Sequence, residues 1–170
     1  QHIIVATGAH WRRDGVGQHQ RLPLAAGDGG PDILTPDDIM AGRAPAAGPV
    51  LVYDDDGYIM AGLIAEKLAR EGHDVTFMTP DAMVSPWTEN TLEQHAIQRR
   101  LLEVGVKLMT GQRLTSLPGG VRHACVYTGA EAELTTAAAV LVTSRISNDG
   151  LWRELQARAD AGGAPWRSLT

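Results

Sequence analysis

The sequence has a single cysteine, no long apolar run and no basic cluster. Because Cys125 is the only thiol among the 170 residues, a disulfide framework and a multi-cysteine metal or iron–sulfur site within this chain are excluded. No stretch approaches the ~18 consecutive apolar residues that cross a bilayer. The formal charge of -5, with no basic run longer than Arg-Arg, argues against nucleic acid or an anionic membrane as a partner. These absences favour a cytoplasmic protein.

The composition is that of a globular α/β protein. Apolar residues make up 44% of the chain and charged residues 21%, which is ordinary for one compact domain. The chain begins at Gln1, without an initiator Met and without a charged leader, directly inside the apolar run HIIVAT. We expect residues 2–7 to form a buried strand, and we expect the chain to be a piece of a longer protein.

The central feature of the sequence is residues 49–71, PVLVYDDDGYIMAGLIAEKLARE. Residues 50–53 form an apolar run typical of a buried strand, and a tight turn follows. Beyond the turn, apolar residues recur at the spacing of one helix face: Ile59, Met60, Leu63, Ile64 and Leu68. A strand, a turn and a helix in this order open a dinucleotide-binding βαβ unit.

The flanking segments predict further elements of a parallel sheet. Residues 10–34 are rich in Gly, Pro, Arg and Asp and predict a linker or surface crossing, and Thr35 is expected to cap a short helix over 36–41. Strands are expected at 74–78 and 106–109. Between them Asn90 and Glu93 resemble a capping box that opens a helix through Val104. In that helix we expect Leu92, Ile97, Leu101 and Val104 to face the core, and Gln94, Gln98, Arg99 and Arg100 to face solvent.

The second half of the chain predicts a hairpin and a returning strand. Residues 113–117 and 121–128, around Pro-Gly-Gly, are typical of antiparallel strands, and 137–143 is a buried strand that rejoins the sheet. Asn148 is expected to cap a final helix over 149–159, with Leu151, Trp152 and Leu155 facing inward. Together the elements predict a Rossmann-like, three-layer α/β domain whose parallel sheet carries an added antiparallel hairpin.

The turn after the central strand carries the wrong chemistry for a phosphate. A dinucleotide turn uses glycines so that backbone N–H groups approach the pyrophosphate. Here Gly57 and Gly62 are present, but Asp54, Asp55 and Asp56 fill the preceding positions. A phosphate about 5 Å from one carboxylate meets a repulsion of about 3 kcal/mol, against about 1 kcal/mol of attraction from the helix terminus. We therefore predict a degenerate nucleotide turn.

Two alternatives for this turn stay open. A nicotinamide cofactor could still bind there, although the end of the next strand, 78–80, offers neither the acid of NAD sites nor the Arg of NADP sites. The three carboxylates could also hold a hard cation such as Mg²⁺. The prediction is that the turn holds no metal, because carboxylates at a helix N-terminus are also favourable to the helix dipole.

Other reactive side chains predict no catalytic site. The six histidines show no i, i+4 pair, so no metal site is predicted. His123 and Cys125 share one face of a predicted strand, and we interpret them as packing residues rather than a catalytic dyad. Trp11 and Trp87 lie in predicted loops. Either could contact a partner, and packing against an adjoining domain is the favoured role.

Four segments, in order, carry a family resemblance: HIIVATGAHWRRDGVG, LVYDDDGYIMAGLIAEKLAREGHDVTFMTP, WTENTLEQHAIQRRLLEVGV and VLVTSRISNDGLWREL. They resemble the C-terminal half of the trimethylamine/dimethylamine dehydrogenase family. Histamine dehydrogenase and, more distantly, 2,4-dienoyl-CoA reductase are related flavoenzymes. The resemblance implies an NADH:flavin oxidoreductase-like architecture, in which an N-terminal TIM barrel carries FMN and a 4Fe-4S cluster. Two domains resembling the FAD and NAD(P)-binding domains of glutathione reductase then follow.

The resemblance implies a division of this chain. Residues 49–143 would be the NAD(P)-binding-like domain. Residues 1–48, an edge strand and linker, and 144–170, a connector and helix, would belong to a neighbouring domain that holds ADP or FAD. By their match to the family's Ala-Thr-Gly stretch, Thr7 and Gly8 are expected at the edge of that nucleotide site.

The implied function is that of a fragment of a flavoprotein that oxidatively demethylates small secondary and tertiary amines. The family's catalytic residues and cofactor-linking cysteines have no counterparts here, so the fragment is expected to bind no cofactor and to be inactive alone. In the amine dehydrogenases electrons leave to an electron-transfer flavoprotein, with which the acidic turn agrees. Two alternatives remain: an active NAD(P)H-binding domain of a 2,4-dienoyl-CoA reductase-like enzyme, and a docking module for the electron-transfer flavoprotein.

Overall fold

The computed structural model of the chain describes residues 2–24, 27–162 and 168–169. The chain divides into a larger unit, Trp11–Ser144, and a smaller unit made of Gln1–His10 and Arg145–Thr170. The sequence-based division placed a boundary at residue 48, whereas the larger unit here also includes residues 11–48. None of the helices in the described part of the chain combines the length and hydropathy needed to cross a bilayer.

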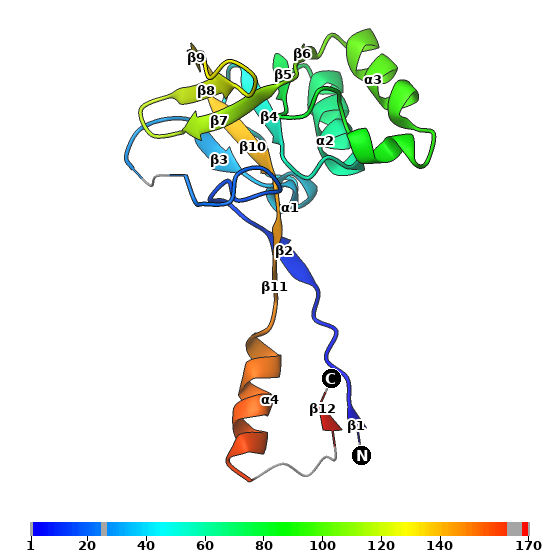
Figure 1. Cartoon of the computed structure of the whole chain (residues 1–170), viewed down its shortest axis with the longest axis vertical. Coiled ribbons are helices and arrows are strands. Elements are labelled where there is room, and N and C mark those ends of the chain that lie inside the picture. The colour runs from blue at the N-terminus through cyan, green and yellow to red at the C-terminus, as the bar shows by residue number, and fades with distance from the viewer. Residues whose placement is uncertain (1, 25–26, 163–167, 170) are drawn as a thin grey trace. The chain divides into compact units, whose positions relative to one another are not determined.

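A five-stranded parallel sheet forms the middle of the larger unit (Figure 1). Its strands, in spatial order, are β3 (Asp32–Leu34), β10 (Ala138–Val142), β4 (Val50–Asp54), β5 (Val75–Met78) and β6 (Lys107–Met109). Every neighbouring pair is parallel. The strands predicted around 50–53, 74–78, 106–109 and 137–143 are therefore confirmed. Both central strands, β4 and β10, are buried along their whole length.

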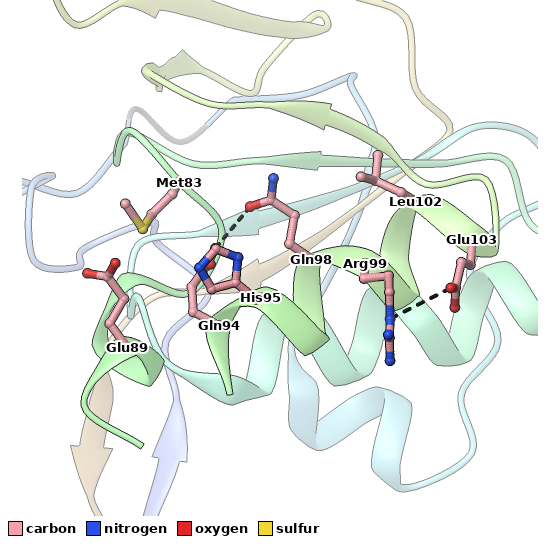
Figure 2. Close-up of a pocket in the computed structure, with 8 residues that line it drawn as sticks. All are labelled: Met83, Glu89, Gln94, His95, Gln98, Arg99, Leu102 and Glu103. Carbon is pink, nitrogen blue, oxygen red and sulfur yellow. Dashed lines mark hydrogen bonds and ion pairs between the residues drawn. The ribbon is translucent and has the colours of Figure 1, made fainter. Parts of the chain in front are cut away.

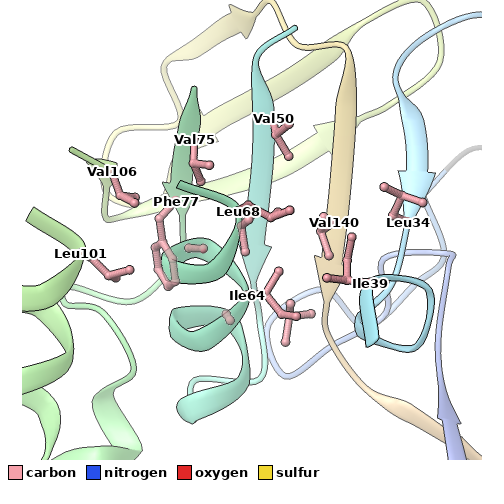
Figure 3. Close-up of a cluster of buried hydrophobic side chains, with 14 of the residues drawn as sticks. Leu34, Ile39, Val50, Ile64, Leu68, Val75, Phe77, Leu101, Val106 and Val140 are labelled. Carbon is pink, nitrogen blue, oxygen red and sulfur yellow. The ribbon is translucent and has the colours of Figure 1, made fainter. Parts of the chain in front are cut away.

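Three helices cover one face of the sheet: α1 (Pro36–Met40), α2 (Ile59–Arg70) and α3 (Gln94–Glu103). As predicted, Thr35 is the N-cap of α1, and its N–H donates to the Asp38 carboxylate at 2.7 Å. The apolar stripe of α2 packs through Ile64 and Leu68 onto the strands, with Phe77 beneath (Figure 3). Alternating residues of β4, such as Val50 and Val52, belong to this core because successive side chains point to opposite faces.

An antiparallel sheet packs on the opposite face. It consists of β7 (Gln112–Ser116), β8 (Val121–Cys125) and β9 (Glu131–Leu134), which confirms the predicted hairpin. A second core joins its Leu114 and Val121 to Leu51, Tyr53 and Leu141 of the parallel sheet. The larger unit is thus a mixed α/β structure with a parallel sheet between helices and antiparallel strands.

The helix predicted from Asn90 is wrong at its start. Residues Pro86–Glu89 form a 3₁₀ turn, η1, and α3 begins only at Gln94. Leu92 adopts φ +62°, a left-handed conformation that a right-handed α-helix cannot include. As a result Leu92 is 91% exposed instead of in the core. Gln94, predicted to face solvent, is buried and donates through Nε2 to the Val84 carbonyl at 3.1 Å.

The smaller unit has no buried residue over 2–10 and 145–162, the part of it whose burial the structure describes. Strand β1 (His2–Ile3) pairs with β12 (Ser168–Leu169), β2 (Ala9–Trp11) pairs with β11 (Arg145–Ser147), and α4 spans Gly150–Asp160. The last residue of β2, Trp11, is counted with the larger unit and is buried. The predicted buried strand over 2–7 is wrong, because only its first two residues are extended in a sheet and Ile4 is 80% exposed.

The last predicted helix exists, but its cap and its inward face are wrong. Asp149, and not Asn148, occupies the N-cap position of α4. No residue of α4 is buried, and Leu151 and Trp152 are 50% and 40% exposed. The described residues of this unit are too few to enclose a core of their own.

Candidate functional site

The acidic turn lies where β4 ends and α2 begins, at the carboxyl edge of the parallel sheet. Ligands of open α/β sheets bind at this edge. Asp54 and Asp55 are nevertheless buried, with 0% and 1% exposure, and Asp56 is half-buried. Two of the three acidic side chains, Asp54 and Asp55, are therefore interior groups and not surface charges.

Asp54 closes the turn from inside. Its Oδ1 accepts the N–H of Gly57 at 2.9 Å and that of Asp56 at 3.2 Å. Its buried Oδ2 has no hydrogen-bond partner among the described residues. Burial raises the pKa of Asp54 to about 7, and the two backbone N–H groups oppose that rise only in part. Gly57 follows at φ +69°, a conformation that glycine adopts at low cost.

Asp55 holds a loop over the turn. Its carboxylate accepts the N–H of His19 at 2.9 Å and of Gln20 at 3.0 Å, and it lies 2.7 Å from His19 Nδ1. Its own N–H donates to the Val142 carbonyl at 2.8 Å. A Cβ added at Gly17 would overlap the Asp55 carboxylate. The segment predicted as a linker or surface crossing thus closes over the turn at 17–20.

A second segment, 81–88, covers the other side of the turn. The N–H of Trp87 donates to the Gly57 carbonyl at 3.0 Å, and a Cβ added at Gly57 would lie 2.9 Å from Trp87 Cδ1. Asp81 lies 3.6 Å from His19 Nε2. Burial raises the pKa of Asp81, and the nearby His19 opposes that rise. Loop 17–20 and segment 81–88 together enclose the turn.

Gly62 and residue 79 serve packing. A Cβ at Gly62 would lie 2.8 Å from Ile97 Cγ2, so this glycine allows α2 and α3 to approach. Thr79 is buried, and its Oγ1 accepts the N–H of Asp81 at 3.2 Å. The position at which dinucleotide sites present an acid or an Arg is therefore used to shape segment 81–88.

The remaining predicted residues have contacts of their own. In the smaller unit Thr7 Oγ1 donates to the carbonyl of Asn148, whose own N–H donates to the Gly8 carbonyl at 2.9 Å. The nucleotide-lining role of Thr7 and Gly8 stays a prediction. In the hairpin, His123 Nδ1 lies 2.9 Å from Gln112 Oε1, while the Thr128 hydroxyl lowers the pKa of the Cys125 thiol. His123 and Cys125 thus have separate partners.

A surface groove of about 450 Å³ lies along α3, apart from the turn (Figure 2). It is lined by Met83, Glu89, Gln94, His95, Gln98, Arg99, Leu102 and Glu103. The sequence did not reveal it, because the misplaced helix start put Gln94 on the wrong face. Within the described residues no three His, Cys, Asp or Glu side chains are grouped to hold a metal ion.

The fold and the covered turn define a mixed α/β domain. The chain belongs to the family of the OYE-like second alpha/beta domain, whose model matches residues 34–120.

Three relatives extend this assignment. The chain is 32% identical over 176 residues to dimethylamine dehydrogenase of Hyphomicrobium sp. (strain x), a match that covers 92% of this chain and 24% of that protein. The structure of histamine dehydrogenase from Rhizobium sp. 4-9 matches all of the chain at a TM-score of 0.93 and 42% identity, over 27% of its own length. The 6-hydroxypseudooxynicotine amine oxidase of Pseudomonas geniculata N1 matches 99% of this chain at a TM-score of 0.88 and 40% identity, over 25% of its length.

The predicted family resemblance is confirmed. The chain spans about a quarter of the length of each of these three relatives.

Proposed function

We propose that this chain is the second α/β domain of a flavin-dependent amine dehydrogenase, in which it serves as a Rossmann-like scaffold that binds no nicotinamide cofactor. The relatives named above support the class of the parent enzyme. The layers support the finer fold assignment, since a parallel sheet between helices and an antiparallel sheet resembles the NAD(P)-binding domain of glutathione-reductase-like enzymes.

The observation that carries this proposal is the Asp55 carboxylate and its three donors. In a working nucleotide turn, backbone N–H groups and space are kept for an anion that arrives with the ligand. Here the anion is part of the chain, and the N–H groups of His19 and Gln20 are already bound to it. A pyrophosphate would have to displace loop 17–20 and then face the carboxylate of Asp55 at close range.

The parent enzyme would supply the chemistry elsewhere. One cysteine cannot hold an iron–sulfur cluster, so the FMN and 4Fe-4S cluster proposed for the parent belong to other domains. Thr7 and Gly8, with residues 144–170, would contribute to a neighbouring domain that holds ADP or FAD. The parent would demethylate small secondary or tertiary amines and pass electrons to an electron-transfer flavoprotein. A cytoplasmic setting stays a prediction.

The test is a calorimetric titration of the chain with NADH and NADPH. The scaffold role predicts no saturable heat up to about 1 mM of either nucleotide, because such an affinity would need more than about 4 kcal/mol of binding free energy against a filled site. A micromolar dissociation constant would overturn the proposal. It would favour the alternative of an active NAD(P)H domain, and Asp55→Gly would then show whether the nucleotide occupies the turn.

A further inference from the structure

One surface loop of the larger unit carries a peptide bond that is prone to rearrange. The sequence holds four Asp-Gly pairs, which begin at Asp14, Asp28, Asp56 and Asp149. In such a pair the glycine nitrogen can attack the aspartate side chain, because glycine has no Cβ to hinder the approach. Only the pair Asp28-Gly29 has both of its residues exposed. The fold therefore singles out one of the four pairs for this reaction.

The two reacting groups of Asp28-Gly29 are not held by hydrogen bonds. Among residues 2–24, 27–162 and 168–169, no group pairs with the Asp28 carboxylate, and the Gly29 N–H donates to no acceptor. Gly29 lies at φ +76°, a conformation that glycine adopts at low cost. Exposed backbone with few hydrogen bonds changes conformation at a low free energy. The Gly29 nitrogen can therefore turn toward the Asp28 side chain.

Two of the other pairs are closed to the reaction by burial and by hydrogen bonds. The Asp14 carboxylate accepts from Arg12 Nε at 2.8 Å, and the following Gly15 is buried. In the acidic turn Gly57 is buried, and its N–H donates to Asp54 Oδ1 at 2.9 Å. Each of these pairs would have to break such contacts before the glycine nitrogen could reach the carboxyl carbon.

The fourth pair lies in the smaller unit and is intermediate. The Asp149 carboxylate accepts from Arg153 Nε at 2.8 Å. Both side chains of this ion pair are partly exposed, so the contact is weaker than a buried one. We therefore expect Asp149 to react more slowly than Asp28 and faster than the two closed pairs.

Loop 27–30 contacts the hairpin turn at 117–120. The Gly119 N–H donates to the Gly29 carbonyl at 3.1 Å. A Cβ added at Gly30 would lie 2.4 Å from the Leu117 carbonyl oxygen, so the two backbones are in close contact. An isoaspartate at residue 28 adds a methylene to the main chain, and the loop cannot then keep its present path against the hairpin.

We propose that Asp28 is a site of spontaneous isomerisation to isoaspartate, and that this change releases loop 27–30 from the hairpin turn. The Gly29 nitrogen forms a bond to Asp28 Cγ, and its proton leaves with the carboxyl hydroxyl as water, so that a succinimide results. A second water opens the ring. When that water adds to the main-chain carbonyl carbon of Asp28, the bond from this carbon to the Gly29 nitrogen breaks, and the chain continues through Cγ. The inference does not depend on the scaffold role proposed above.

The test incubates the full chain in warm buffer near pH 5, where some carboxyl groups still carry a proton. Isoaspartate resists cleavage by endoproteinase Asp-N and is methylated by isoaspartyl methyltransferase, so peptide mapping scores each pair separately. We expect isoaspartate at residue 28 to accumulate at least about fivefold faster than at residues 14 and 56, which must first lose hydrogen bonds. In the isomerised chain, labelled with ¹⁵N, the amide signal of Gly119 should shift and that of Gly57 should not.

Asp28→Glu is the matched variant, because it keeps the charge but would need a larger ring, and it should lose the main product. Asp149→Glu is its control and should retain that product. In concentrated urea the fold is lost while each aspartate keeps its glycine neighbour, so the four rates should converge. Three results would overturn the proposal: isoaspartate as abundant at residue 14 or 56 as at residue 28, the same preference for residue 28 in urea, or an unchanged Gly119 signal in the isomerised chain.

Discussion

The larger unit of this chain buries its large apolar side chains, whereas the smaller unit leaves its apolar side chains partly exposed. In the larger unit the helices and the hairpin bury both faces of one sheet, and Leu51 and Phe77 are completely inaccessible. In the smaller unit no described residue is buried, although α4 carries Leu151 and Trp152 on its surface. The stability of the chain therefore resides in the larger unit, whereas the described segments of the smaller unit form no core.

Removing one large side chain from each unit should have very different effects on stability. Phe77→Ala should lower the free energy of unfolding by about 3–5 kcal/mol, because it opens a cavity in the closed core. Trp152→Ala in α4 should change it by less than about 0.5 kcal/mol, since a half-exposed side chain loses little packing. Chemical denaturation followed by circular dichroism measures both. Comparable losses for the two variants would show that α4 is packed after all.

A smaller effect is expected at the turn. Asp55→Ala leaves the N–H groups of His19 and Gln20 and the His19 ring without their acceptor, which should cost about 2–4 kcal/mol. Asp74→Ala is the matched control, because Asp74 is exposed and pairs with Lys107 at the surface; it should cost less than about 1 kcal/mol. Chemical denaturation curves of the two variants measure the loss of unfolding free energy in each. If the losses are equal, Asp55 does not hold loop 17–20.

The pH dependence of stability separates Asp54 from its neighbour. Its raised pKa, about 7, means that the folded state keeps a proton which the unfolded state releases near pH 4. Stability should therefore fall as pH rises from about 4 to about 7, by up to about 1.4 kcal/mol per pH unit from this group. Asp54→Asn should remove that slope. Denaturation at pH 5 and at pH 7 measures this change in the free energy of unfolding. An unchanged slope in the variant would show that Asp54 does not keep its proton in the folded state.

The smallest expected effect lies on the hairpin side of the sheet. Burial lowers the pKa of His123, so the unfolded chain takes up this proton before the folded chain does. Stability should then fall as pH drops below about 6.5, opposite in sign to the effect of Asp54. His123→Gln should weaken this acid sensitivity. Thermal melts at pH 5.5 and 7.5 compare the variant with the parent chain, and an equal acid shift in both would exclude His123 as the source.

Local sequence patterns predicted the main helices and strands and the family. Contacts between residues far apart in the sequence could not be predicted from such patterns. The strand and helix around the acidic turn and the hairpin around Pro-Gly-Gly are visible because their periodicity and turn residues are local. The cover over Asp55 is invisible in the sequence, since residues 17–20 lie more than thirty positions away and have no period. The capping-box pattern of Asn90 and Glu93 predicted a helix start that is wrong, because Leu92 adopts a positive φ. The type of side chain alone does not reveal a positive φ.

The central claim is that the turn carries its own anion and accepts no other. It is tested most directly by the amide signals of His19, Gln20 and Gly57, followed by NMR while NADPH is added to about 5 mM, a concentration that detects millimolar affinity. If the site is filled by Asp55, these three signals keep their positions and the amides of residues 19 and 20 keep their protection from hydrogen exchange. Saturable shifts at Gly57, with loss of protection at residues 19 and 20, would contradict it, because loop 17–20 would then have opened to admit a phosphate.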